Sequence, residues 1–175
     1  DSVSFLINKK DRIGLTGRNG AGKSTTLKML AGLQIPSEGN ISMASDIKIG
    51  YLPQTKVYTD GNTVRKEAEK AFADLFALKD EVERLNLELA GREDYESEAY
   101  MKLLDKIHEK TELLAIRGEN NIDREVEVVL KGLGFKPEDL DRNCEEFSGG
   151  WRMRIELAKI LLARPDIFLL DEPTN

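Results

Sequence analysis

Nine consecutive residues near the start of the chain have the types and spacing that bind a polyphosphate. Backbone N–H groups must converge on such an anion, and glycines permit the dihedral angles and the close approach that this requires. A helix starting near the end of the run would direct the positive end of its dipole at the same anion. The run is a complete G-x-x-x-x-G-K-[ST] pattern made of Gly17, Arg18, Asn19, Gly20, Ala21, Gly22, Lys23, Ser24 and Thr25.

Two side chains of this loop have further expected roles. Lys23 would reach the β- and γ-phosphates as a point charge, and the Ser24 hydroxyl would ligate Mg²⁺. Residues 12–16 are predicted to form a β-strand and residues 26–31 a helix. Because the motif requires a strand before it and a helix after it, this context separates a phosphate site from a chance glycine-rich turn.

A second group of chemically competent residues closes the chain. The run Ile-Phe-Leu-Leu at 167–170 is followed by Asp171 and Glu172. Four large apolar residues predict a strand buried on both faces of a sheet, and α/β sheets place ligands at the carboxyl ends of their strands. Asp171 is then expected to ligate Mg²⁺, directly or through water. Glu172 is expected to polarise the attacking water, as a general base or as an orienting acceptor.

Gln54 directly follows a predicted strand at 48–52 and the residue Pro53. An amide in that place can extend toward a metal ion or a water in the neighbouring cleft. A single glutamine in a loop is ordinarily just solvated, so both interpretations stay open for Gln54.

Ser148, Gly149 and Gly150 precede a predicted helix at 153–163 and form a second candidate anion site. A serine, two glycines and a helix start can make a nest of N–H groups. One chain does not need two γ-phosphate sites. We therefore expect this nest to serve a nucleotide held mainly by another domain, in a head-to-tail pair.

From residue 63 the apolar pattern changes to alternating steps of four and three, which is the seam of a helix that packs on another helix. Residues 90–94 interrupt the pattern, and a returning helix continues it. The prediction is an antiparallel helical hairpin. Its seam consists of Val64, Ala68, Ala71, Leu75, Leu78, Val82, Leu85 and Leu89, then Tyr100, Leu104, Ile107, Thr111 and Leu114.

Charged residues of both signs are concentrated in this hairpin. Residues 62–117 carry ten basic and fourteen acidic side chains, in a chain of net charge −6. No global basic field would recruit nucleic acid, so any such contact must come from a local patch. The hairpin is either a solvated spacer or an arm that touches a partner. His108 is expected to be a solvated surface residue, and the single Cys144 an ordinary thiol.

Further elements complete the predicted organisation. Residues 3–7 and 12–16 are expected to form a β-hairpin around a turn at 8–11, residues 40–43 another strand, and residues 123–133 a helix capped by Gly134. No apolar run approaches the ~18 residues that cross a bilayer, and no leader peptide opens the chain, which favours the cytoplasm. Both ends look cut, so we expect a fragment of a longer protein.

These motifs, in this order and spacing, resemble the nucleotide-binding domain of an ABC ATPase over the whole chain. Residues 17–25 match the Walker A loop, Gln54 the Q-loop, residues 148–150 the signature, and Asp171 with Glu172 the Walker B pair. The resemblance implies an α/β P-loop NTPase fold with a RecA-like core, a small antiparallel β part and an inserted α-helical subdomain. The corresponding divisions are 1–62, 63–147 with an arm at about 63–117, and 148–175.

The same resemblance implies ATP and Mg²⁺ as cofactors. Lys23, Gln54 and Glu172 then take catalytic roles, and Ser24, Gln54 and Asp171 ligate the metal. The signature variant FSGGWRMR, the DEPTN continuation and the helical insert are similar to the ABC-F subfamily, and specifically to the first of its two tandem domains. That similarity implies a translation factor that binds the ribosome near the tRNA exit site, with the arm directed toward ribosomal RNA or protein.

Some features of the family pattern differ or fall outside the chain. Trp151 replaces the usual signature glutamine. The adenine-stacking aromatic would precede Asp1, and the D-loop and switch histidine would follow Asn175, so the isolated chain is expected to bind nucleotide weakly and hydrolyse little. The alternative function is the ATP-binding subunit of an ABC transporter. A structural or DNA-repair ATPase would need longer coiled coils or zinc-binding cysteines.

Overall fold

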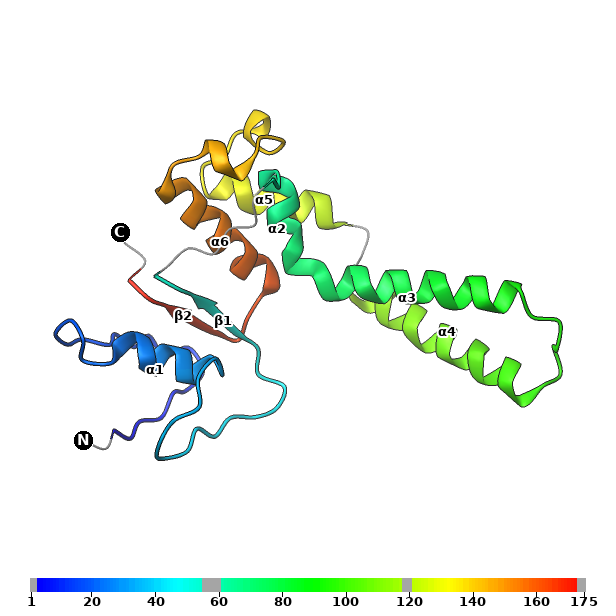
Figure 1. Ribbon diagram of the computed structural model, residues 1–175, viewed down its shortest axis with the longest axis horizontal. Coiled ribbons are helices and arrows are strands. Elements are labelled where there is room, and N and C mark those ends of the chain that lie inside the picture. Colours follow the sequence, from blue (N-terminus) through cyan, green and yellow to red (C-terminus); the bar gives the residue numbers. More distant parts are fainter. Residues whose placement is uncertain (1–2, 55–60, 118–120, 173–175) are drawn as a thin grey trace.

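The computed structural model describes residues 3–54, 61–117 and 121–172. A core of one small sheet and several helices carries a long helical hairpin that projects from one side (Figure 1). In chain order the elements are α1 Lys23–Leu30, β1 Ile49–Leu52, α2 Val64–Glu69, the 3₁₀ turn η1 Lys70–Phe72, α3 Ala73–Ala90, α4 Glu98–Arg117, α5 Ile122–Gly132, η3 Pro137–Asp139, η4 Cys144–Glu146, α6 Gly149–Ala163 and β2 Ile167–Leu170.

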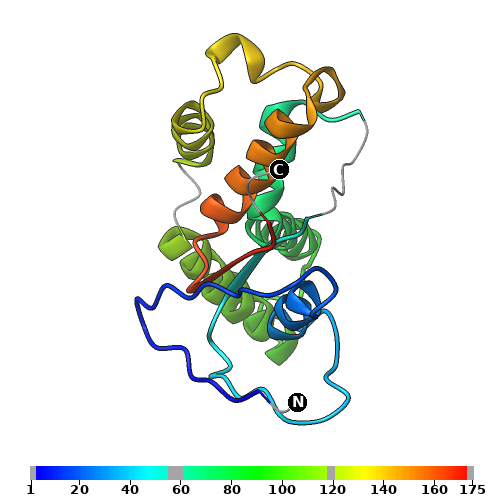
Figure 2. The same ribbon diagram turned by 90° about the vertical axis from the view of Figure 1, so that its left-hand side faces the viewer.

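The sheet joins two strands from opposite ends of the chain. β1 and β2 are parallel and pair from Ile49 with Ile167 to Leu52 with Leu170. The sheet lies between α1 on one side and α6 on the other (Figures 1 and 2). Gly50 lets α6 pack closely on the sheet, because a Cβ at residue 50 would overlap the Ile160 side chain. Since β1 and β2 are parallel, their carboxyl ends meet at one edge of the sheet.

The prediction of strands at 3–7, 12–16 and 40–43 is wrong. The structure gives these residues no regular secondary structure, so the small antiparallel β part and the strand before the phosphate loop do not form in the described residues. The turn at 8–11 does form, with the Asp11 N–H donating to the Asn8 carbonyl at 3.1 Å. A two-stranded hairpin is marginally stable unless a third strand or a helix covers its apolar face. Here that face stays open, with Val3 79% and Phe5 47% exposed.

The prediction that the last strand is buried on both faces is also wrong. β2 buries Leu169 but leaves Phe168 37% and Leu170 40% exposed. Because side chains alternate between the faces of a strand, only the face carrying Leu169 is fully covered. A continuous apolar run shows that a strand can be buried on both faces, but the burial itself depends on what packs against it.

The main hydrophobic core lies among helices α2, α5 and α6. Their inward residues recur every three or four positions, as in Ile122, Val126 and Leu130 of α5. α5 matches the predicted helix at 123–133, and Gly134 ends it in the left-handed conformation at φ 96°. α6 begins at Gly149, earlier than the predicted start at 153. The other core residues are Val64, Ala68, Leu75, Leu114, Phe135, Leu140, Cys144, Phe147, Ile155, Ala158 and Leu162.

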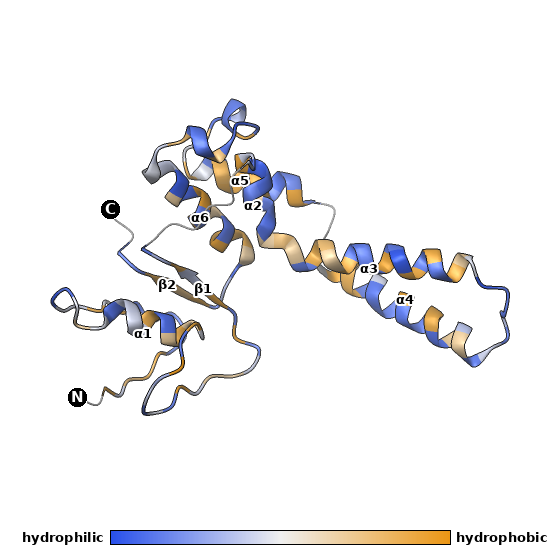
Figure 3. Ribbon diagram, in the orientation of Figure 1, coloured by the Kyte–Doolittle hydropathy of each residue, from blue (hydrophilic) through white to orange (hydrophobic). Residues whose placement is uncertain are grey.

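The predicted antiparallel hairpin is confirmed, with two differences. α3 and α4 run side by side and bury Leu75, Leu85, Leu103 and Leu114. The predicted seam omitted Leu103 and included Thr111, which is exposed. The single long helix expected from residue 63 is broken by η1, since α2 packs on α6 while α3 leaves the core to pack on α4. Figure 3 shows apolar residues where the hairpin joins the core and a polar outer face along most of its length.

Candidate functional site

The glycine-rich loop enters α1 through two residues in the left-handed conformation. Gly20 has φ 82° and Gly22, the N-cap of α1, has φ 92°. A residue with a Cβ rarely adopts these angles, so the glycines let the chain turn directly into the helix. The first N–H groups of α1, which have no partner within the helix, therefore follow the loop directly, and the helix dipole favours an anion there.

Lys23 closes this loop with its own side chain. Its Nζ donates to the carbonyl oxygens of Gly17 at 2.9 Å and Arg18 at 3.2 Å. The ammonium group is thereby held over the loop, beside the N-terminus of α1. Its positive charge and the helix dipole both favour an anion at this place.

Two of the three candidate metal ligands meet across the molecule. Ser24 Oγ donates to Asp171 Oδ1 at 2.9 Å, although the residues are 147 positions apart in sequence. Asp171 is 4% exposed, and its backbone N–H donates to the Leu52 carbonyl at 3.0 Å, which extends the strand ladder by one bond. The strand pairing therefore fixes the carboxylate beside the start of α1.

Tyr51 is a site residue that sequence reasoning did not single out. Its hydroxyl donates to Asp171 Oδ2 at 3.3 Å. Burial raises the pKa of Tyr51, and the charge and hydrogen bond of Asp171 raise it further. The register of β1 against β2 is what brings the phenol to this carboxylate, and no local pattern around Tyr51 carries that register.

Gln54 and Glu172 also meet at this edge. Both lie two residues beyond the paired ends Leu52 and Leu170, and Gln54 Nε2 donates to Glu172 Oε2 at 2.6 Å. Glu172 has φ 50°, a left-handed conformation that is uncommon for a residue with a side chain and is often found at functional sites. Gln54 thus contacts the second acid of the motif.

Ser148 is the N-cap of α6, and Gly149 and Gly150 form its first turn. This end of α6 and the helix α1 lie on opposite sides of the sheet (Figures 1 and 2). Trp151 packs edge-on against Phe135 with ring centroids 5.0 Å apart, and the Arg154 guanidinium lies 4.5 Å from the Trp151 ring centroid. The tryptophan that replaces the usual glutamine therefore anchors the signature to the helical core.

Comparison with known families decides the assignment. The family model described as ABC transporter matches residues 1–175. The chain belongs to the ABC transporter family. Domains of this ABC family bind ATP, generally with Mg²⁺, and hydrolyse it.

Individual relatives place this ABC domain with the F branch of the family. It is 35% identical to ABC transporter F family member 5 of Arabidopsis thaliana over 99% of the chain and 25% of that relative. It is 37% identical to the energy-dependent translational throttle protein EttA of Escherichia coli O6:H1 over 99% of the chain and 30% of that relative. The chain thus spans about a quarter to a third of the curated relatives it matches.

Solved structures support the ABC fold. A metal-chelate type ABC transporter in an inward-facing conformation aligns with a TM-score of 0.62 and 22% identity, over 97% of this chain and 53% of that one. The likeness shows the P-loop ATPase fold. Within the described part of this ABC domain, no helix combines the length and the apolarity that a membrane span needs.

The oxygen atoms at the sheet edge suit Mg²⁺. The described residues hold no group of three or more His, Cys, Asp or Glu side chains that could form an all-protein metal site. Mg²⁺ in nucleotide sites uses only one or two protein oxygens and takes the rest from phosphates and water. The Ser24 hydroxyl and the buried Asp171 carboxylate, which makes no ion pair among the described residues, fit that pattern.

Proposed function

We propose that this ABC-F domain binds Mg²⁺–ATP between the loop at 17–25 and the Asp171 edge of the sheet. The observation that carries the proposal is the 2.9 Å contact between Ser24 Oγ and Asp171 Oδ1. It joins the expected phosphate site to the expected metal site. The loop N–H groups and Lys23 would bind the β- and γ-phosphates, so the Lys23 ammonium would exchange the carbonyls of Gly17 and Arg18 for phosphate oxygens.

Ser24 and Asp171 would hold Mg²⁺, with Gln54 as a further candidate ligand. When bound, the ion would neutralise charge on the β- and γ-phosphate oxygens. Glu172 would orient the attacking water and accept its proton, and the hydrogen bond from Gln54 would set the direction of the carboxylate. In this arrangement Gln54 links the metal region to the group that acts on water.

The signature at Ser148 would complete a nucleotide site on a second ABC domain. Its position supports this, because α1 and the start of α6 lie on opposite sides of the sheet rather than around one site. A head-to-tail pair would use the loop of each domain and the signature of the other. We infer that the second domain belongs to the same polypeptide, and that this chain is the first of the two.

The whole protein is proposed to be a cytoplasmic translation factor that works as an ATP-driven switch on the ribosome, where it would contact rRNA and tRNA. Support comes from the name of the relative EttA, a translational throttle, and from the projecting hairpin α3–α4. The second candidate is the ATP-binding subunit of an ABC transporter, which the likeness to a transporter structure favours. A transporter subunit has no evident use for a long hairpin after the Q-loop.

Ribosome binding by the full-length protein separates the two functions. Glu172→Gln should slow hydrolysis and trap the ATP-bound form, because the amide cannot accept the proton of the water. We expect this variant to sediment with ribosomes in ATP and to stay in the supernatant without nucleotide. A trapped variant that never sediments with ribosomes would contradict the translation role.

A further inference from the structure

Two charged side chains are buried in the described part of the chain, and one of them lies outside the nucleotide site. Asp171 belongs to that site, whereas Glu67 lies on α2 and is 3% exposed. A buried carboxylate is costly unless it is paired and hydrogen-bonded, so its partners indicate what it holds together.

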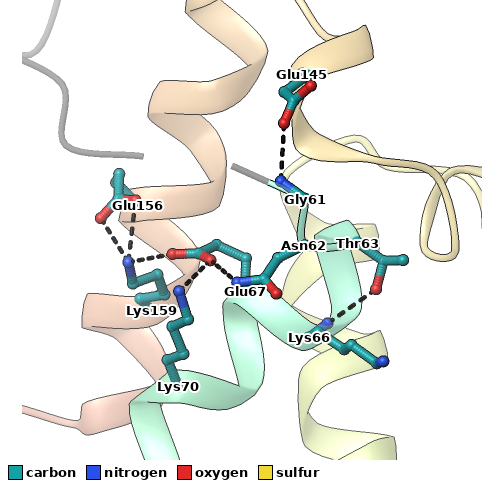
Figure 4. Close-up of polar contacts among 9 residues, drawn as sticks. All are labelled: Gly61, Asn62, Thr63, Lys66, Glu67, Lys70, Glu145, Glu156 and Lys159. Atoms are coloured by element: carbon teal, nitrogen blue, oxygen red, sulfur yellow. Dashed lines mark hydrogen bonds and ion pairs between the residues drawn. The ribbon is translucent and has the colours of Figure 1, made fainter. Parts of the chain in front are cut away.

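Glu67 receives three donors (Figure 4). Lys159 Nζ lies 2.9 Å from Oε1, while Lys70 Nζ at 2.6 Å and Asn62 Nδ2 at 3.0 Å contact Oε2. Lys159 also contacts Glu156 at 3.0 Å. Burial would raise the pKa of Glu67, but the hydrogen bonds from Lys70, Lys159 and Asn62 outweigh it and lower the pKa. The Glu67–Lys159 pair is therefore ionised at neutral pH.

Lys159 is 92 residues from Glu67 in sequence, whereas Lys70 lies three residues after Glu67 and Asn62 five residues before it. Lys159 lies on α6, the helix that runs from the signature toward β2 and Asp171. Lys70 begins η1, the 3₁₀ turn at which the chain leaves α2 and enters the hairpin. Asn62 lies in the segment that connects β1 and Gln54 to α2. Glu67 is thus bonded at once to the signature helix, to the root of the hairpin and to the Q-loop side.

The Asn62 segment is itself tied to the residues just before the signature. The Gly61 N–H donates to Glu145 Oε1 at 2.8 Å, and the Cys144 N–H donates to the Asn62 carbonyl at 2.9 Å. The residues just before α6 are therefore bonded directly to the Asn62 segment, in addition to the link through Glu67 and Lys159.

Directional bonds at this place do something that apolar packing does not. The hydrophobic effect is non-directional, so helices held by it alone can shift relative to each other. A buried ion pair contributes little net stability compared with a well-packed apolar pair, but it fixes one geometry. A 3₁₀ stretch inside a helix often marks a hinge. Here the 3₁₀ turn η1 begins at Lys70, and Lys70 is one of the residues bonded to Glu67.

We propose that Glu67 is a positioning residue that couples the orientation of α6 to the orientation of the α3–α4 hairpin. The inference rests on the proposed function, in which ATP brings the signature against a second domain and so moves α6. Glu67 would carry that movement to η1 through Lys159 and Lys70, and the hairpin would amplify a small rotation at its root into a displacement at its tip.

The test measures the hairpin in the full-length protein with the other accessible cysteines replaced. Spin labels on Glu38→Cys, in the segment between α1 and β1, and on Glu96→Cys at the hairpin tip report one distance, with and without Mg²⁺ and a non-hydrolysable ATP analogue. Both positions are exposed, while Cys144 is buried and burial raises the pKa of its thiol, so the labels react elsewhere. Nucleotide binding is measured on the same samples.

Four variants separate coupling from stability. Glu67→Gln removes the central charge, and Glu67→Gln/Lys159→Met removes both charges, so that no lone ion is left buried if the single variant fails to fold. Lys159→Arg keeps the charge and serves as the conservative rescue. Glu81→Gln is the matched control, because Glu81 pairs with Lys110 across the hairpin.

We expect the analogue to shift the label distance in the unaltered protein, in Lys159→Arg and in Glu81→Gln. The shift should be lost in Glu67→Gln and in the folded double variant while nucleotide binding is retained. A full shift in the folded double variant would overturn the inference. So would an unaltered protein that binds the analogue without any shift, although its ATP-binding role would stand. An unaltered protein that binds no analogue contradicts the proposed function and the inference together.

Discussion

The helical core around α6 and the projecting hairpin α3–α4 use the same residue types in opposite ways. The core buries Val126 and Leu130 completely and holds the Glu67 carboxylate of the pair Glu67–Lys159 at 3% exposure. In the cross-helix pair Glu81–Lys110 of the hairpin, the carboxylate is 32% exposed. Charge in the core fixes geometry, whereas charge on the hairpin mainly keeps an extended element in solution. Four single substitutions and one double variant test this contrast.

Glu67→Gln should have the largest effect on stability. It removes the buried charge that Lys159 and Lys70 contact, and leaves the 23% exposed Lys159 with Glu156 alone. Breaking a buried pair costs up to about 3–5 kcal/mol of unfolding free energy. Urea unfolding followed by circular dichroism measures the loss. Glu67→Gln/Lys159→Met should recover much of it, and a double variant as unstable as the single one would contradict this explanation.

The pH dependence of the stability that the Glu67–Lys159 pair contributes follows from the directions of the two pKa shifts. Glu67 has a lowered pKa, so its contribution is present above the ordinary value of 4.5 and is lost as pH falls through the folded pKa. Burial lowers the pKa of Lys159, but hydrogen bonds to Glu67 and Glu156 raise it overall. Its contribution is present below 10.5 and is lost as pH rises through the folded pKa. The double variant should show a flatter stability profile at both ends, and an unchanged profile would contradict it.

Leu130→Ala should cost about 2–5 kcal/mol, because it removes a fully buried side chain and leaves a cavity in the core. Its hairpin control is Leu87→Ala, at a residue that is 74% exposed and should change stability by less than about 0.5 kcal/mol. Thermal or urea unfolding compares the two. Equal effects would show that the hairpin face around Leu87 is covered in the folded protein.

Glu81→Gln should have the smallest effect. Its hydrogen bond from Lys110 is the main reason that the pKa of Glu81 is lowered, but the pair is open to solvent and to salt. We expect no measurable change in the unfolding midpoint at moderate ionic strength. A destabilisation as large as that of Glu67→Gln would remove the distinction between the two regions.

Short-range spacing was sufficient to predict much of the site and the hairpin. The loop at 17–25, the seam of α3 and α4, and the placement of Gln54 and Asp171 beyond strand ends all follow from local patterns. Parallel strands bring their carboxyl ends to one edge, so the meeting of Gln54 with Glu172 was also predictable. The meeting of Ser24 with Asp171 was expected because both were predicted to ligate the same Mg²⁺.

The parts that could not be predicted depend on tertiary partners. The Tyr51–Asp171 contact needs the strand register, and Glu67 looked like one more solvated acid in a charged segment. The strands at 3–7 and 12–16 have strand-like sequences, but an alternating pattern forms a stable strand only when another element covers it. The break at η1 arises because α2 and α3 pack on different helices.

The central claim, that Ser24 and Asp171 hold Mg²⁺–ATP, is tested most directly by calorimetric titration of Mg²⁺–ATP into the full-length protein. Asp171→Asn removes the carboxylate charge while keeping its shape, and Tyr51→Phe is the control that removes only the hydroxyl contact. We predict that Asp171→Asn weakens one binding event by about tenfold or more, in line with the loss of a charged contact, and that Tyr51→Phe has a smaller effect. Unchanged Mg²⁺–ATP binding in Asp171→Asn would contradict the account.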